Sequence, residues 1–264
     1  MRPRRERLKG HLTYVTIELG EPGARMAGER GDVVVLIDAL RASTTITCAL
    51  AAGAQRVLPV LHVDEATALT AWHGYLCAGE RGGAKVPGFD FGNSPTEMLT
   101  GRDRLRGQTL VLTTSNGTRC VQAAVEAGAA ALVSGALPNA AATVLAAWRL
   151  ADRHGRDITL LAAGLDDEVA IEDTFAARWL LQALVALGEQ AGAPITHAPF
   201  ESVAAADSAE VFRTSEAGVR LTGLGYAADV AYCARIDSLR IVPLYRAQVG
   251  FVPWTGEPEE TSDD

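Results

Sequence analysis

DVVVLIDALRAST, residues 32–44, determines the fold class of this 264-residue chain. Its first part, DVVVLI, is an apolar run without alternation, which is typical of a β-strand buried on both faces of a parallel sheet. Asp38 ends the run, and residues 45–52 have the composition of a helix that Gly53 terminates. A buried strand, a short polar loop and a helix in this order predict one unit of an α/β fold.

The same order of elements recurs along the chain. Apolar runs predict further strands at residues 56–61, 75–78, 109–113, 130–133, 158–162 and 239–242. Ala/Leu-rich segments predict helices at 64–73, 119–127, 140–153, 174–187 and over most of 203–233. The alternation predicts an α/β protein, a three-layer α/β/α fold with a largely parallel or mixed sheet. We expect a single domain over 13–252, with a division into two lobes left open, and flexible termini at 1–12 and 253–264.

Composition and charge limit the function classes open to the chain. With 48% hydrophobic and 21% charged residues it is typical of soluble globular proteins. Its net charge of −8 argues against nucleic acid or an anionic membrane as partner, since both select basic surfaces. No apolar run approaches the roughly 18 residues that span a bilayer, and no secretory signal follows the basic N-terminus. We expect a cytoplasmic protein, and a homodimer is compatible with the sequence.

The cysteines and histidines point away from a zinc or His-based site. Cys48, Cys77, Cys120 and Cys233 lie far apart in apolar or helical contexts, without the paired spacing of zinc ligands. We expect them to be buried free thiols. The five histidines lie outside the polar loops, so a His-centred triad has little support.

Polar side chains and glycines gather in residues 79–97, GERGGAKVPGFDFGNSPTE. Five glycines and two prolines break regular structure there, so we expect a long loop without helix or strand. Glycines let a backbone approach a ligand closely, while Arg and Lys attract anions and carboxylates attract hard cations. The side chains of this loop that are able to bind ligands are Glu80, Arg81, Lys85, Asp90, Asn93, Ser94 and Glu97. The alternative is a surface loop whose charges are only solvated.

The loop after the first strand, DALRAST, is suited to binding an anion and a metal. A helix N-terminus offers N–H groups to a phosphate, and Asp38 is placed to ligate Mg²⁺ or to act as nucleophile or base. Arg41, Ser43 and Thr44 follow as one cation and two hydroxyl groups. The alternative is that Asp38 and Ser43 only cap the helix.

Two further strand-to-helix loops carry similar groups. TTSNGTR, residues 113–119, can wrap an oxyanion with its hydroxyl and amide donors, the alternative being an Asn-Gly turn with helix caps. The loop after residues 158–162 holds five carboxylates, of which Glu172 and Asp173 lie nearest the next helix. Because ligands in open α/β sheets bind beyond the carboxyl ends of the strands, all these loops are expected to meet in one cleft.

We assign three roles to the side chains of this cleft. The expected catalytic residues are Asp38, Arg41, Glu80, Arg81 and Asn116. The expected substrate-binding residues are Ser43, Thr44, Lys85, Asn93, Ser94, Thr114, Thr118 and Arg119. The expected ligands of Mg²⁺ are Asp38, Glu80, Asp90, Glu172 and Asp173. The cations Arg41, Arg81, Lys85 and Arg119 exceed what a phosphate monoester needs, which predicts a second anionic group, a carboxylate or sulfonate, on the substrate.

Known phosphatase designs narrow the chemistry. A haloacid-dehalogenase-type phosphatase needs an aspartate at the position where this chain has Leu40. A Cys phosphatase needs a cysteine followed by five residues and an arginine, and no cysteine of this chain has that spacing. The Gly-Lys-Ser/Thr pattern of a P-loop is also absent. What remains is metal-assisted attack on a phosphoryl group. The alternative from another class is a non-catalytic module that binds a small phosphorylated or sulfonated metabolite. Such a module has no need of several carboxylates, which repel an anion unless a metal intervenes.

These motifs resemble those of the 2-phosphosulfolactate phosphatase family. The resemblance rests on IDALRAST, GERGGAKVPGFDFGNSP, TTSNGTR, GALPN and AIEDTFAAR, in that order over residues from about 33 to 180, and continues more weakly to Cys233. It implies a Mg²⁺-dependent phosphatase that converts 2-phospho-3-sulfolactate to sulfolactate and phosphate, a step toward coenzyme M in methanogens. Bacterial members are widespread where no coenzyme M is made, so another phosphorylated 2-hydroxy acid is an alternative substrate. The expected partner is a small anionic phosphorylated metabolite.

Overall fold

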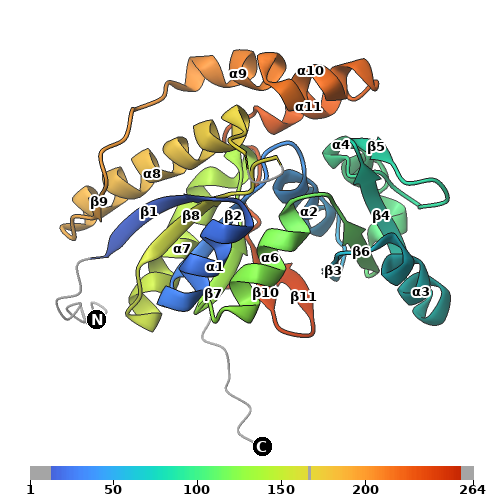
Figure 1. Cartoon of the computed structure of the whole chain (residues 1–264), viewed down its shortest axis with the longest axis horizontal. Helices are drawn as coiled ribbons and strands as arrows, with labels where there is room; N and C mark the ends of the chain where they lie inside the picture. Colours follow the sequence, from blue (N-terminus) through green and yellow to red (C-terminus); the bar gives the residue numbers. More distant parts are fainter. Residues whose placement is uncertain (1–12, 166–167, 257–264) are drawn as a thin grey trace, which may run out of the picture.

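The computed structural model describes residues 13–165 and 168–256 and has an α/β/α architecture. Its strands form a mixed sheet of eleven strands in the order β5-β4-β6-β3-β11-β10-β7-β2-β8-β1-β9. Figure 1 shows helices on both faces of this sheet and a further group, α9 to α11, lying across one end of the strands. The predicted three-layer fold with a mixed sheet is thereby confirmed.

The strands and helices have the following bounds. The strands are β1 Tyr14–Leu19, β2 Val33–Ile37, β3 Arg56–Val60, β4 Leu76–Arg81, β5 Ala84–Lys85, β6 Thr109–Thr113, β7 Ala131–Ser134, β8 Ile158–Ala162, β9 Thr196–His197, β10 Pro243–Arg246 and β11 Gly250–Pro253. The α-helices are α1 Gly20–Arg30, α2 Ala42–Ala51, α3 Val63–His73, α4 Pro95–Thr100, α5 Arg102–Leu105, α6 Gly117–Glu126, α7 Ala140–His154, α8 Ile171–Ala191, α9 Ser208–Thr214, α10 Glu216–Gly223 and α11 Ala227–Cys233.

Strand β2 shows why its apolar run contains no alternation. It pairs in parallel with β7 on one side and with β8 on the other, and all its residues are buried. Val33, Val35 and Ile37 belong to a hydrophobic cluster with residues of α7 and α8. Val34 and Leu36 belong to a second cluster with residues of α1, α2 and α6. Both faces of β2 are therefore covered by helices, as the sequence predicts.

The middle of the sheet is made by the C-terminal hairpin of β10 and β11. The hairpin is antiparallel, and its outer edges pair with two parallel blocks, β10 with β7 through Leu244 and Val133, and β11 with β3 through Phe251 and Val57. One block is β4, β6 and β3, and the other is β7, β2, β8, β1 and β9. The hairpin thus joins two parallel sheets into one.

Helices α9, α10 and α11, here called the cap, lie across the carboxyl ends of the strands at the top of Figure 1. Phe212 of α9, Leu221 of α10 and Val230 of α11 are buried in the same cluster as α7 and α8. The cap also contacts α4 through α11. These contacts close one side of the space above the strand ends.

Several expected elements differ from the observed ones. The strand expected at 239–242 lies at 243–246, and its hairpin partner β11, like β1 and α1, was not predicted. Pro253 ends β11 and the Trp254 N–H donates to Val242 O at 2.8 Å, so the tail expected to be flexible from 253 is ordered at its start. Residues 1–12 and 257–264 lie outside the described residues. Residues 79–97 are not a plain loop, since they contain the end of β4, β5 and the start of α4.

The prediction for the cysteines is confirmed. Cys48, Cys77, Cys120 and Cys233 are all buried and free of disulfides. Burial raises the pKa of the Cys48 thiol to about 12 and also raises those of Cys77 and Cys233. None of these three is therefore a ready nucleophile at neutral pH. Within residues 13–165 and 168–256, no helix is long and apolar enough to cross a membrane.

Candidate active site

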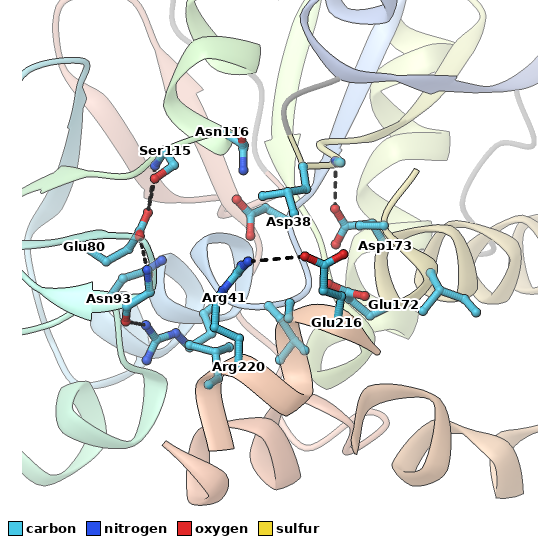
Figure 2. A pocket seen from close by; sticks show the side chains of 18 of the residues that line it. Asp38, Arg41, Glu80, Asn93, Ser115, Asn116, Glu172, Asp173, Glu216 and Arg220 are labelled. Atoms are coloured by element: carbon cyan, nitrogen blue, oxygen red, sulfur yellow. Dashed lines mark hydrogen bonds and ion pairs between the residues drawn. The ribbon is translucent and has the colours of Figure 1, made fainter. Parts of the chain in front are cut away.

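A cavity of about 600 Å³ lies between the carboxyl ends of the strands and the cap. Seven of the residues predicted from the sequence line it: Asp38, Arg41, Glu80, Asn93, Asn116, Glu172 and Asp173. Figure 2 shows Asp38 in the middle, with Glu80, Asn93 and Ser115 on one side and Glu172, Asp173 and Glu216 on the other. The expected meeting of separate loops at the strand ends is therefore observed.

Asp38 lies directly after β2, between the starts of α2 and α6. Its Oδ1 accepts a hydrogen bond from the Ala42 N–H at 2.9 Å, and its own backbone N–H donates to the Ser43 hydroxyl at 3.0 Å. A Cβ atom on Gly117, the first residue of α6, would come 2.8 Å from Asp38 Oδ2. Only glycine allows α6 to begin this close to the carboxylate.

Three of the carboxyl groups around the cavity have raised pKa values, because they are buried and lie close to other carboxyl groups. Burial raises the pKa of Asp38 to about 6, and the charges of Glu80 and Glu172 add to that rise. Burial also raises the pKa of Glu172. The pKa of Asp173 is raised well above its ordinary value, first by burial and then by the charges of Asp38 and Glu172. A cation in the cavity would relieve this repulsion.

Two of the buried carboxylates hold loops together. Asp173 accepts hydrogen bonds from the Ala39 N–H at 2.7 Å and from the Gly164 N–H at 2.9 Å, so it connects the loops after β2 and β8. Glu80 accepts from the Gly83 N–H at 2.8 Å and from both the N–H and the hydroxyl of Ser115. It therefore connects the turn after β4 with the loop after β6.

Arg41 is held by the cap and by the turn after β4. Its Nη1 donates to Asp229 Oδ2 of α11 at 2.9 Å, and both side chains are 1% exposed. Its Nη2 donates to Gly83 O at 2.6 Å, and its guanidinium lies 4.3 Å from the ring centre of Tyr226. The other oxygen of Asp229 accepts from the hydroxyls of Ser94 and Thr96. One buried carboxylate of the cap thus fixes both polar loops.

The cap adds cavity residues that the sequence analysis did not identify. Glu216 and Arg220 of α10 line the cavity, with Arg220 Nη1 and Glu216 Oε1 3.9 Å apart. The sequence contains a weak signal for them, the Gly-Val-Arg-Leu segment at 218–221 that continues the family resemblance. Reasoning from strand ends alone could not reach these positions, because α10 follows no strand directly.

The remaining predicted residues lie outside the cavity wall. They are Ser43, Thr44, Arg81, Lys85, Asp90, Ser94, Thr114, Thr118 and Arg119. Arg81 follows Glu80 in β4, and neighbouring side chains of a strand point to opposite faces. Arg81 accordingly donates to Leu61 O at 3.0 Å and to Thr113 Oγ1 at 2.9 Å. Its expected catalytic role is not supported by this position.

The other outlying residues bind parts of the chain itself. Lys85 Nζ donates to Asp90 O at 2.8 Å, and the Asp90 carboxylate pairs with Arg104, so Asp90 is not at the expected metal site. The Ser94 hydroxyl accepts from the Glu97 N–H and caps α4. The hydroxyls of Ser43 and Thr44 donate to backbone carbonyls, and the Thr118 hydroxyl donates to the backbone carbonyl of Thr114. The Arg119 guanidinium donates to Asn116 Oδ1 at 2.9 Å. The open alternative of structural caps and turns describes these residues better than substrate binding does.

Known proteins are similar to this chain over most of its length. The family model described as 2-phosphosulpholactate phosphatase matches residues 22–248, from α1 into the C-terminal hairpin. The chain belongs to the 2-phosphosulfolactate phosphatase family. The matched range includes the cap, so both walls of the cavity lie within the part typical of 2-phosphosulfolactate phosphatases.

Three relatives illustrate how far the similarity to 2-phosphosulfolactate phosphatases extends. A probable 2-phosphosulfolactate phosphatase of Carboxydothermus hydrogenoformans is 38% identical over 223 residues, covering 82% of this chain and 87% of the relative. A probable 2-phosphosulfolactate phosphatase of Deinococcus radiodurans is 37% identical, covering 80% and 87%. A 2-phosphosulfolactate phosphatase of Methanothermobacter thermautotrophicus is 37% identical, covering 83% and 88%.

The carboxylates of the cavity in this member of the 2-phosphosulfolactate phosphatase family could hold Mg²⁺ through one or two side chains. Among the described residues, no three or more His, Cys, Asp or Glu side chains are grouped as a metal site. Mg²⁺ is usually held by only one or two carboxylates and keeps waters or phosphate oxygens as its other ligands. Asp38 and Glu172 are the candidates for that role, because backbone amides donate to both oxygens of Asp173 and to both oxygens of Glu80, while the Ala42 amide donates to Oδ1 of Asp38.

Proposed function

We propose that this chain is a Mg²⁺-dependent phosphatase that hydrolyses the phosphate monoester of a 2-hydroxy acid, with 2-phospho-3-sulfolactate as the first candidate. Membership of a family of phosphoric monoester hydrolases supports the reaction, and the names of the relatives support the substrate. The observation that carries the proposal is the group of buried carboxyl groups at the strand ends, Asp38, Glu172 and Asp173, whose pKa values are all raised. Such a group is suited to a cation and unsuited to an anion alone.

The proposed reaction needs few covalent changes. A bond forms between phosphorus and the oxygen of water, the phosphorus–oxygen bond of the ester breaks, and the alcohol oxygen takes up a proton to give 3-sulfolactate and phosphate. Mg²⁺, when bound, neutralises charge on the phosphoryl group and lowers the pKa of water. Asp38 and Glu172 would hold it.

The other residues keep the site in place. Asp38 is fixed by the Ala42 amide and the close approach of Gly117, while Asp173 fixes the loop at Gly164. Arg41 is fixed in the cavity wall by its ion pair with Asp229. Most groups are therefore oriented before substrate arrives, which reduces the cost of reaching the transition state.

The test is a phosphate-release assay on 2-phospho-3-sulfolactate, 2-phospholactate and 4-nitrophenyl phosphate, with Mg²⁺ and after removal of metal by EDTA. We expect activity only with Mg²⁺, and we expect Asp38→Asn and Glu172→Gln each to reduce kcat/KM by about 100-fold or more. Glu189→Gln, an exposed change at the far end of the same helix as Glu172, is the control and should leave the rate unchanged.

Two outcomes would contradict the proposal. Full activity in metal-free buffer would show that the carboxylates serve another purpose. Binding of a phosphorylated metabolite without any phosphate release would favour the non-catalytic binding module instead. Circular dichroism of each variant establishes that a lost rate is not a lost fold.

A further inference from the structure

We propose that Arg220 of the cap binds the second anionic group of the substrate, a carboxylate or sulfonate, and so gives the enzyme its selectivity for phosphate esters that carry one. The inference rests on the proposed function, because it concerns the substrate of the same cavity. It assigns the selectivity to α10, whereas the sequence motifs of the strand ends concern the phosphoryl side.

The first argument is the balance of charge in the cavity. Among the residues that the structure describes, five carboxylates line it: Asp38, Glu80, Glu172, Asp173 and Glu216. In the part of the chain that the structure describes, Arg41 and Arg220 are the cationic side chains of its wall. A substrate with a phosphate and a further anionic group needs positive partners at both ends. Mg²⁺ can serve the phosphate, and a cation with free donors is required for the second anionic group.

Arg41 is unsuited to the second anion because its donors are already committed. One nitrogen of its guanidinium donates to Asp229 and another to Gly83 O, and the Tyr226 ring covers it. Its side chain is 1% exposed. A residue bound in this way shapes the wall but cannot turn toward an incoming group without breaking a buried ion pair.

Arg220 has the opposite character. Its side chain is 37% exposed, and its contact with Glu216, at 3.9 Å, is at the limit of an ion pair with a partner that is itself 82% exposed. Its Nε is buried and has no hydrogen-bond partner among the described residues. A buried donor without an acceptor is unfavourable, so an oxyanion that accepts from it would be bound favourably. The planar fork of arginine matches a carboxylate or sulfonate with two parallel hydrogen bonds.

The position of Arg220 completes the argument. It projects from the cap into the cavity, while Asp38 lies at the end of β2 (Figure 2). A substrate held by its phosphate at the strand ends therefore presents its remaining groups to α10. Arg220 is four residues after Glu216 on that helix, so the weak pair with Glu216 keeps the guanidinium near the cavity until substrate replaces it.

The test compares kcat/KM of the wild type, Arg220→Gln and Arg220→Lys on 2-phospho-3-sulfolactate, 2-phospholactate and 4-nitrophenyl phosphate. We expect Arg220→Gln to lower kcat/KM by about 10- to 100-fold on the two substrates with a second anion, mainly through KM, and by less than about threefold on 4-nitrophenyl phosphate. Arg220→Lys should recover part of the loss, because it keeps the charge but not the fork. Arg213→Gln, on the neighbouring α9 and outside the cavity, is the matched control.

A second measurement separates this inference from the proposed function. Calorimetric titration of 3-sulfolactate, which needs no turnover, should show binding to the wild type and a loss of about tenfold or more in Arg220→Gln. If no ester is hydrolysed but this difference is found, the proposed reaction fails and the role of Arg220 stands. Equal losses on all three esters, or unchanged binding of 3-sulfolactate, would overturn the role of Arg220.

Discussion

Asp38 is an acid whose surroundings oppose its ionisation. Its pKa rises from 3.8 to about 6 because the side chain is buried, with the charges of Glu80 and Glu172 adding to the effect. The folded state therefore holds the proton more tightly than the unfolded chain does. Raising the pH from about 4 to about 6 removes that proton and favours unfolding. The penalty, about 3 kcal/mol for a shift of this size, is present above pH 6 and absent below pH 4.

We expect the metal-free protein to lose stability as the pH rises from 4.5 to 7, measured by urea unfolding in EDTA. In Asp38→Asn the loss should be smaller by about 1–3 kcal/mol, since the amide does not ionise. Mg²⁺ should restore stability at pH 7 more than at pH 4.5, where the carboxyl group is protonated. The same pH dependence in wild type and variant would show that Asp38 is not the group responsible.

Gly117 offers a second test at the residue scale. A methyl group there would lie 2.8 Å from Asp38 Oδ2 and 3.2 Å from Ala42 Cβ, so α6 must shift away from the carboxylate in Gly117→Ala. We expect a stability loss of about 1–3 kcal/mol and a fall in kcat/KM of about tenfold or more, because a displacement of this kind misplaces a reacting group. Gly223→Ala, where a Cβ has no neighbour within 4 Å, is the control. Unchanged turnover in Gly117→Ala would mean that the distance between α6 and Asp38 is not critical.

At the scale of elements, Asp229 connects three of them. This side chain of α11 binds Arg41 before α2 and Ser94 and Thr96 at the start of α4, and Asp229, Arg41 and Ser94 are buried. Asp229→Asn leaves a buried guanidinium without its counter-charge. We expect it to lower the free energy of unfolding by about 3–5 kcal/mol. Glu210→Gln, which breaks the exposed pair with Arg213, should cost less than about 1 kcal/mol. Similar losses in both variants, in chemical denaturation, would contradict a special role for Asp229.

Elements with a strong local pattern could be predicted, and those defined by distant partners could not. The apolar run of β2 identifies a strand covered on both faces, and α7 is found within one residue at its end. The hairpin of β10 and β11 has only short, proline-bounded strands, and its place between β3 and β7 depends on residues more than a hundred positions away. No local pattern specifies such a pairing.

The site residues at strand ends could also be predicted from the sequence, and those brought in by tertiary packing could not. Strand ends located Asp38, Glu80 and Asn116, because parallel strands deliver their loops to one edge. Arg81 was misplaced because its side chain points to the other face of β4 from that of Glu80. Arg220 was missed because the cap reaches the cavity by tertiary packing alone. Composition of a loop indicates which groups are near a site, but the backbone decides which of them face it.

At the scale of the whole molecule, stability depends on the centre of the sheet. Phe251 of β11 is fully buried, packs edge-on against Tyr245 at 5.4 Å and pairs with Val57 of β3. We expect Phe251→Ala to cost about 3–5 kcal/mol. Trp72→Ala removes a larger side chain that is 79% exposed and should cost little. Equal midpoints of thermal unfolding for these two variants would show that the two parallel blocks are stable without the hairpin.

The central hairpin also orders events on the ribosome. Strands β1 to β8 are synthesised before residues 243–253, so the inner edges of β3 and β7 stay unpaired until the hairpin has left the exit tunnel. Open strand edges attract strands of other molecules. A nascent chain of this kind therefore needs chaperone protection until the hairpin has emerged, and a chain cut short after α11 would aggregate through two separate strand edges.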